Sequence, residues 1–180
     1  MSSLRIAVIV LWALFWLYWL IAARDVKEGS RARRARPASA AILVLALALP
    51  RALGLSDLNQ RSSLVRSVGL GILLASLAFA IWARLCLGRN WGMPMTEKRE
   101  PELVTSGPYR LVRHPIYTGI LGGVLGTALA TNLLALIALV LMGAYFIYCA
   151  RVEEALMSST FPSAYERYRQ RTKMLIPFVL

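Results

Sequence analysis

The feature that most constrains the fold of this sequence is a set of long apolar runs separated by polar segments. Residues 4–23, 38–55, 67–83 and 116–150 carry few charges, and the last run is 35 residues long. A helix needs about 20 apolar residues to cross the hydrocarbon core of a bilayer. Backbone groups inside a bilayer must satisfy their own hydrogen bonds, which favours helices. The sequence therefore predicts an all-α integral membrane protein.

The run at 116–150 is too long for one membrane span and short for two. Thr131 and Asn132 form a polar break near its middle. We therefore expect a tight helical hairpin, which brings the total to about five transmembrane helices. In the third run, Gly69 and Gly71 should allow a neighbouring helix to approach closely.

The basic residues follow the gaps between the apolar runs. Of the 21 Lys and Arg, 17 lie in residues 24–37, 84–115 and 151–180, and the net charge is +12. Membrane proteins gather Lys and Arg in cytosolic loops, so these three segments are expected to face the cytosol.

The basic residues are not interleaved with aromatics on a soluble face, so no nucleic-acid partner is expected. One histidine and two cysteines are too few for a four-ligand zinc site, and no metal is expected.

The least generic stretch is the polar segment 107–119, where the last apolar run begins. It reads Gly-Pro-Tyr-Arg-Leu-Val-Arg-His-Pro-Ile-Tyr-Thr-Gly and contains the only histidine of the chain. Gly107 and Pro108 predict a turn. His114 precedes a proline and should avoid the α region, whereas Pro115 suits the first turn of a helix. We expect a polar elbow at the end of a membrane helix.

Two acidic residues, Glu153 and Glu154, follow the same apolar run at its other end. Antiparallel arms of similar length return the chain to its starting level, so these acids should lie near the elbow. Acids beside a long apolar run are costly unless they are paired, and Arg151 could pair with Glu154. Further on, residues 163–166 read Ser-Ala-Tyr-Glu, a capping-box pattern that predicts a cytosolic amphipathic tail helix starting there.

The elbow pattern Gly-Pro-Tyr-Arg-x-x-Arg-His-Pro-x-Tyr-x-Gly resembles the signature of the isoprenylcysteine carboxyl methyltransferase family, and phospholipid N-methyltransferases share its Arg-His-Pro-x-Tyr core. A second element matches in the same order, namely the glutamate pair, Phe161-x-x-x-Tyr165-x-x-Tyr168, and Ile176-Pro177. The resemblance covers residues 85–180. It implies a membrane methyltransferase that uses S-adenosylmethionine, with its core in residues 84–180 and N-terminal transmembrane helices in residues 1–83.

The resemblance also implies which residues bind S-adenosylmethionine, namely Tyr109, His114, Tyr117, Glu153 and Glu154. A carboxylate acceptor is already ionised at pH 7 and needs no general base. It does need a cation to orient it, and Arg113 and Arg151 are the candidate catalytic residues. An amine or thiol acceptor would instead require deprotonation by His114 or a glutamate.

The methyl acceptor is expected to be amphiphilic or lipid-like and to enter from the bilayer. Gly119, Gly122, Gly123 and Gly126 give the first hairpin arm a small face, which suits close contact with a neighbouring helix or with a ligand and could line a lateral entry. A carboxylate of the isoprenylcysteine type is favoured, and a phospholipid amine or a small amine or thiol is the alternative. A nicotinamide-dependent membrane reductase and a non-enzymatic scaffold that binds anionic lipids through residues 24–37 are rival functions outside this enzyme class.

Overall fold

The computed structural model describes residues 3–22, 29–30, 62–91, 97–98 and 102–179, and the predicted second span at 38–55 lies outside them. Over these ranges the chain forms the helices α1 (Ser3–Ala22), α3 (Ser63–Leu87), α4 (Pro115–Ala130), α5 (Ala135–Thr160) and α6 (Pro162–Arg171). Two single 3₁₀ turns are η1 (Gly88–Asn90) and η2 (Gly107–Arg110). The two-residue strands β1 (Gly29–Ser30) and β2 (Glu97–Lys98) pair antiparallel.

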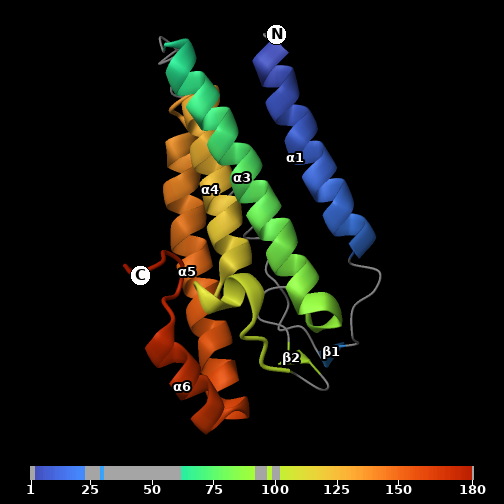
Figure 1. Cartoon of the computed structure of the whole chain (residues 1–180), viewed down its shortest axis with the longest axis vertical. Coiled ribbons are helices and arrows are strands. Elements are labelled where there is room, and N and C mark those ends of the chain that lie inside the picture. The colour runs from blue at the N-terminus through green and yellow to red at the C-terminus, as the bar shows by residue number, and fades with distance from the viewer. Residues whose placement is uncertain (1–2, 23–28, 31–61, 92–96, 99–101, 180) are drawn as a thin grey trace.

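The apolar helices run alongside one another, and α6 folds against the far end of α5 (Figure 1). Within the described ranges, α1, α3 and α5 are long and apolar enough to cross a membrane. The 16 residues of α4 measure about 24 Å, which is shorter than the ~30 Å hydrocarbon core. The chain is an all-α integral membrane protein, as its sequence predicts.

Helix α3 extends beyond the predicted span 67–83 at both ends. Its first turn is capped by the hydroxyl of Ser62, which accepts a hydrogen bond from the backbone nitrogen of Val65 at 3.4 Å. Near its other end, the buried guanidinium of Arg84 donates to the carbonyl oxygens of Gly88 at 2.6 Å and Ala22 at 2.7 Å. These carbonyls lie at the ends of α3 and α1, where they lack intrahelical partners. Because they accept the hydrogen bonds of Arg84, its charge is accommodated and α3 continues past it.

Helix α4 packs on α3 through glycines at backbone distance. A Cβ on Gly126 would lie 2.5 Å from the backbone nitrogen of Leu73, and one on Gly69 would lie 2.5 Å from that of Ala130. A Cβ on Gly119 would lie 2.7 Å from the carbonyl oxygen of Ser76. The expected helix contact at the α4 glycines is therefore confirmed and the expected lateral entry is wrong, because α3 and, at Gly123, Trp12 of α1 fill that space. Among the residues that the structure describes, nothing lies within 4 Å of a Cβ on Gly71, so the close approach expected there is not seen in this part of the chain.

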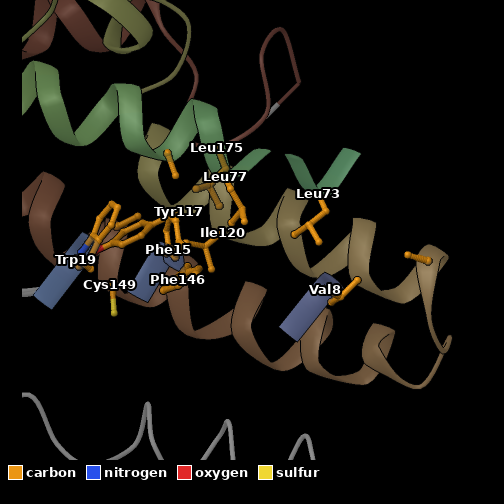
Figure 2. Packing of buried hydrophobic residues seen from close by; sticks show 13 residues of the cluster. Val8, Phe15, Trp19, Leu73, Leu77, Tyr117, Ile120, Phe146, Cys149 and Leu175 are labelled. Atoms are coloured by element: carbon orange, nitrogen blue, oxygen red, sulfur yellow. The ribbon is translucent and has the colours of Figure 1, made fainter. Parts of the chain in front are cut away.

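The main apolar core joins α1, α3, α4, α5 and the C-terminal tail (Figure 2). Phe15 and Trp19 of α1 reach the same cluster as Tyr117 of α4, and Phe146 of α5 stacks on Tyr117 with ring centroids 4.5 Å apart. From the tail, Leu175 is buried in this cluster. The packing therefore fixes Tyr117 between α1, α5 and the tail.

The hairpin between α4 and α5 forms where the polar break predicts it. The side-chain oxygen of Asn132 accepts a hydrogen bond from the backbone nitrogen of Leu134 at 3.0 Å, an Asx-type turn. At the tail, α6 begins at Pro162 with Phe161 as its N-cap and no side-chain cap. The predicted capping box at Ser163 is therefore wrong, because proline already supplies the fixed φ angle of the first helical position.

Candidate active site

The elbow at residues 107–114 has the predicted backbone. Gly107 adopts φ +59°, which a residue with a Cβ rarely adopts, and η2 follows immediately. His114 is the N-cap of α4 with φ −123° and ψ 60°, and Pro115 holds the first helical position. His114 makes no side-chain cap, so its imidazole remains available for other contacts.

The C-terminal tail runs alongside the elbow and hydrogen-bonds to it. The backbone nitrogen of Arg113 donates to the carbonyl of Lys173 at 2.8 Å, and that of His114 donates to the carbonyl of Met174 at 3.1 Å. The hydroxyl of Thr118 donates to the carbonyl of Leu175 at 2.6 Å. These tail carbonyls partly replace the caps that the start of α4 lacks. We refer to residues 172–175 as the tail strap.

His114 lies between the two glutamates of α5. Its Nδ1 is 3.4 Å from Glu153 Oε2, and its Nε2 is 3.3 Å from Glu154 Oε1. The hydroxyl of Tyr117 donates to Glu153 Oε1 at 2.5 Å, and Nε of Arg113 donates to Glu154 Oε1 at 2.7 Å. The structure thus brings these five predicted residues into one cluster, which we call the histidine cluster.

The charges of the histidine cluster balance only when His114 is protonated. Burial alone lowers the pKa of His114, but hydrogen bonds to Glu153 and Glu154 and their negative charges outweigh burial and raise the pKa above 6.5. A protonated imidazole donates from both nitrogens, whereas a neutral one can donate from only one. The two carboxylates therefore favour the cationic form.

Arg113 connects the histidine cluster to the tail strap. Besides Glu154, its guanidinium donates through Nη1 to the carbonyls of Arg169, at 3.3 Å, and Thr172. The hydroxyl of Thr172 in turn donates to the carbonyl of Tyr168 at 2.8 Å. Glu154 and the end of α6 are thereby held by one buried cation.

Two predicted site residues lie apart from the histidine cluster. Tyr109 is buried in η2, where its carbonyl accepts a hydrogen bond from the hydroxyl of Tyr168 at 2.7 Å. Burial, followed by the neighbouring Tyr168 and Glu153, raises the pKa of Tyr109, so its hydroxyl stays neutral. Arg151 is exposed on α5. The predicted Arg151–Glu154 pair does not form, because Glu154 binds Arg113 and His114 instead.

Sequence reasoning missed Phe146, Thr118 and the tail strap. Phe146 stacks on Tyr117, and it precedes Glu153 by seven residues, a spacing that places both on one helix face. That spacing could have revealed it. The tail strap acts through backbone carbonyls, which leave no signal in the side-chain pattern.

Comparison of the sequence with known protein families identifies the family of this chain. The family model for phospholipid methyltransferases matches residues 64–164. The chain belongs to the phospholipid methyltransferase family. The matched stretch contains α3, the elbow, α4 and the glutamate pair, so the family resemblance expected from the sequence is confirmed.

Named relatives extend the comparison. The cobalt-zinc-cadmium resistance protein CzcN of Cupriavidus metallidurans is 36% identical over 111 residues, covering 60% of this chain and 48% of the relative. The protein-S-isoprenylcysteine O-methyltransferase of Schizosaccharomyces pombe is 30% identical over 126 residues, covering 68% and 53%. The chain therefore spans about half the length of these curated relatives.

A solved structure shows the same fold. The eukaryotic intramembrane Ras methyltransferase ICMT superposes with a TM-score of 0.59 at 22% identity, over 83% of this chain and 54% of that one. At this identity the likeness supports the helical arrangement, not a shared substrate. The fold class expected from the sequence is thus supported independently of the motifs.

Proposed function

We propose that this chain is an integral-membrane methyltransferase that uses S-adenosylmethionine and acts on an amphiphilic acceptor. The observation that carries the proposal is the histidine cluster, where His114 lies between Glu153 and Glu154. Its residues come from both ends of the α4–α5 hairpin, which supports the idea that the two separated motifs serve one site.

The chemistry of the histidine cluster fits S-adenosylmethionine. The ligand carries ribose hydroxyls, an ammonium and a sulfonium, all of which carboxylates can bind or neutralise. When bound, it supplies an electrophilic methyl group on that sulfonium. Of the charged side chains in the cluster, Glu153 is the most exposed, at 27% against 9–11% for Arg113, His114 and Glu154. We therefore assign Glu153 to direct contact with the cofactor.

The remaining cluster residues hold Glu153 in place. Tyr117 donates to one oxygen of Glu153 and His114 approaches the other, which fixes the orientation of the carboxylate. Glu154 stays buried and balances the charges of Arg113 and His114. We assign Glu154 and Arg113 as positioning residues. Tyr109 completes the proposed pocket wall from η2.

A carboxylate is the acceptor that the cluster supports best. A protonated His114 cannot act as a base, and a carboxylate needs none. Arg113 and Arg151 are the proposed acceptor-orienting residues. Because Arg113 already binds Glu154 and the tail strap, the exposed Arg151 has more freedom to meet an acceptor. The Schizosaccharomyces pombe relative is named as a protein-S-isoprenylcysteine O-methyltransferase.

The site is proposed to face the cytosol. The segments 24–37, 84–115 and 151–180, which hold 17 of the 21 Lys and Arg, are the ones expected there. In support, β1 pairs with β2, so the first two of these segments meet. The elbow and the start of the tail strap also meet, through the Val112–Lys173 bridge.

The direct test is methyl transfer from radiolabelled S-adenosylmethionine by the purified protein in detergent. Three acceptors are compared, namely a prenylated cysteine with a free carboxylate, phosphatidylethanolamine, and an alkyl thiol. We expect label on the prenylated cysteine and none on its methyl ester. Label only on the amine or thiol would move the proposal to that acceptor class. No label on any acceptor, with reduction of a sterol by NADPH instead, would refute methyl transfer.

A further inference from the structure

A cationic pocket lies beside the tail strap, two of whose residues, Thr172 and Lys173, line it. Its cavity volume is about 360 Å³, and it opens between the end of η2, the last turn of α6 and residues 172–178. Among the described residues, the lining has no acidic side chain and five cationic ones, namely Arg110, Arg113, Arg169, Arg171 and Lys173. The histidine cluster shares only Arg113 with it.

Most of the pocket cations have no acidic partner close by. Arg113 is neutralised by Glu154, and Arg169 reaches Glu166 only at 3.9 Å with both side chains more than half exposed. Within the part of the chain that the structure describes, no carboxylate forms an ion pair with Arg110, Arg171 or Lys173. Like charges around one cavity repel each other, and a bound anion would relieve that repulsion.

The rim of the pocket is apolar and exposed. Phe178 is 93% exposed, and Val179, Ile176 and Leu111 are exposed as well. Phe178 adopts φ +66°, unusual for a residue with a large side chain, in a turn closed by the Val179–Ile176 hydrogen bond. Binding of a free anion would not require an exposed apolar rim. A ligand with a charged head and acyl chains does, because aromatic and aliphatic side chains insert at the boundary between headgroups and chains.

We propose that this pocket binds the phosphate of an anionic membrane phospholipid, with residues 176–179 inserted among the acyl chains. Guanidinium and ammonium groups bind phosphate oxygens through charge-assisted hydrogen bonds, and clustered Lys and Arg attract anionic lipids to the membrane surface. The lipid is a ligand here and receives no methyl group. By holding the tail strap against the membrane, it stabilises the contacts that the strap makes with the elbow.

The test uses binding of short-chain phosphatidylglycerol to the detergent-purified full chain, measured by calorimetry. Arg171→Gln with Lys173→Gln removes two pocket charges and leaves the backbone carbonyl of Lys173 in place. Arg167→Gln is the control, because it removes one positive charge from α6 at a residue that does not line the pocket. We expect the double variant to weaken binding by about 30-fold, since each cation near an anionic headgroup contributes about fivefold. The control should change binding far less.

Two further probes separate a lipid from a free anion. Inorganic phosphate and short-chain phosphatidylcholine should both bind much more weakly than phosphatidylglycerol. Phe178→Asn, whose new residue tolerates positive φ, should weaken phosphatidylglycerol binding without changing phosphate binding. Equal affinity for phosphate and phosphatidylglycerol would overturn the lipid assignment. Unchanged binding in the double variant, or an equal loss in Arg167→Gln, would overturn the pocket itself.

The outcome is independent of the proposed methyltransferase activity. S-adenosylmethionine binding is measured on the same samples, and we expect it to persist in the double variant. Loss of lipid binding with cofactor binding intact identifies a separate lipid pocket. If the wild-type protein binds phosphatidylglycerol but not S-adenosylmethionine, the lipid pocket stands and the proposed function fails.

Discussion

Helix α4 is held by different kinds of contact along its length and at its start. Along its length, α4 meets α3 through glycines, with Gly126 and Gly69 bringing the backbones to contact distance. At its start, His114 and Arg113 are held by two carboxylates and by carbonyls of the tail strap. The glycine interface brings two backbones together with Ser76 as a polar side chain beside Gly122, whereas the charged end concentrates carboxylates and cations. Changes at the first should therefore affect stability alone, and changes at the second should also affect binding.

The largest effect is expected from Glu154→Ala at the charged end. The change leaves Arg113 buried, 9% exposed, without its carboxylate, and breaking a buried pair costs about 3–5 kcal/mol. Thermal unfolding in detergent should report this loss. Glu166→Ala is the control, because its pair with Arg169 is exposed and is worth at most ~1 kcal/mol. Similar melting temperatures for the two variants would contradict the claim that Arg113 and Glu154 hold this end together.

A smaller effect is expected from Gly126→Ala at the glycine interface. The new Cβ would lie 2.5 Å from the backbone nitrogen of Leu73, so the helices must separate, at a cost of roughly 1–3 kcal/mol. Gly71→Ala on α3 is the matched control, since no described residue lies within 4 Å of its Cβ. S-adenosylmethionine affinity should hold in both variants at a temperature where they are folded. Lost cofactor affinity in folded Gly126→Ala would contradict the claim that the glycine interface serves stability alone.

The third prediction separates two roles within the charged end. Arg151→Gln should raise KM for a carboxylate acceptor about tenfold, the effect of losing roughly 1.4 kcal/mol of charge-assisted binding. S-adenosylmethionine affinity should not change, because Arg151 is exposed and lies outside the histidine cluster. Steady-state kinetics with Arg167→Gln as the control would measure this. An unchanged KM would leave Arg113 as the only acceptor-orienting candidate.

The smallest effect is a pH dependence of stability at the charged end. The folded-state pKa of His114 is raised above 6.5, so its contribution is fully present below pH 6.5 and is lost as pH rises through the folded-state pKa. The melting temperature of the wild type should fall over that interval. His114→Gln should lack this part of the decline. Parallel curves for the two proteins would show that the imidazole does not carry the effect.

The parts of the fold that could be predicted depend on local chemistry. Gly107 and Pro115 set backbone angles by themselves, so the elbow and the start of α4 follow from the sequence. The break at Asn132 divides the apolar run, and the second arm runs back past the start of the first, which brings Glu153 near His114. The convergence of the two motifs is therefore predictable from the residues alone.

The rest depends on which surfaces meet, and the side-chain pattern does not encode this. Gly126 marks a close approach, but its sequence position could not tell a helix partner from a lateral entry. The charge of Arg84 predicts that the apolar helix ends before it, and only its carbonyl partners in the structure explain why the helix continues. The tail strap accepts hydrogen bonds from Arg113 and His114 through carbonyls, which every residue carries. Long-range backbone pairing of this kind is invisible to residue patterns.

The central claim is that the charged end of α4 and its partners on α5 form the S-adenosylmethionine site, with Glu153 in direct contact. Calorimetric titration of the purified wild type, Glu153→Gln and Glu166→Gln with S-adenosylmethionine tests it most directly. We expect saturable binding by the wild type and by Glu166→Gln. Glu153→Gln should bind roughly 10- to 100-fold more weakly, as one lost charge-assisted hydrogen bond implies, with a smaller loss of melting temperature than Glu154→Ala, because Glu153 is the more exposed of the two glutamates. Equal affinity in all three proteins, or no saturable binding by the wild type, would contradict the account.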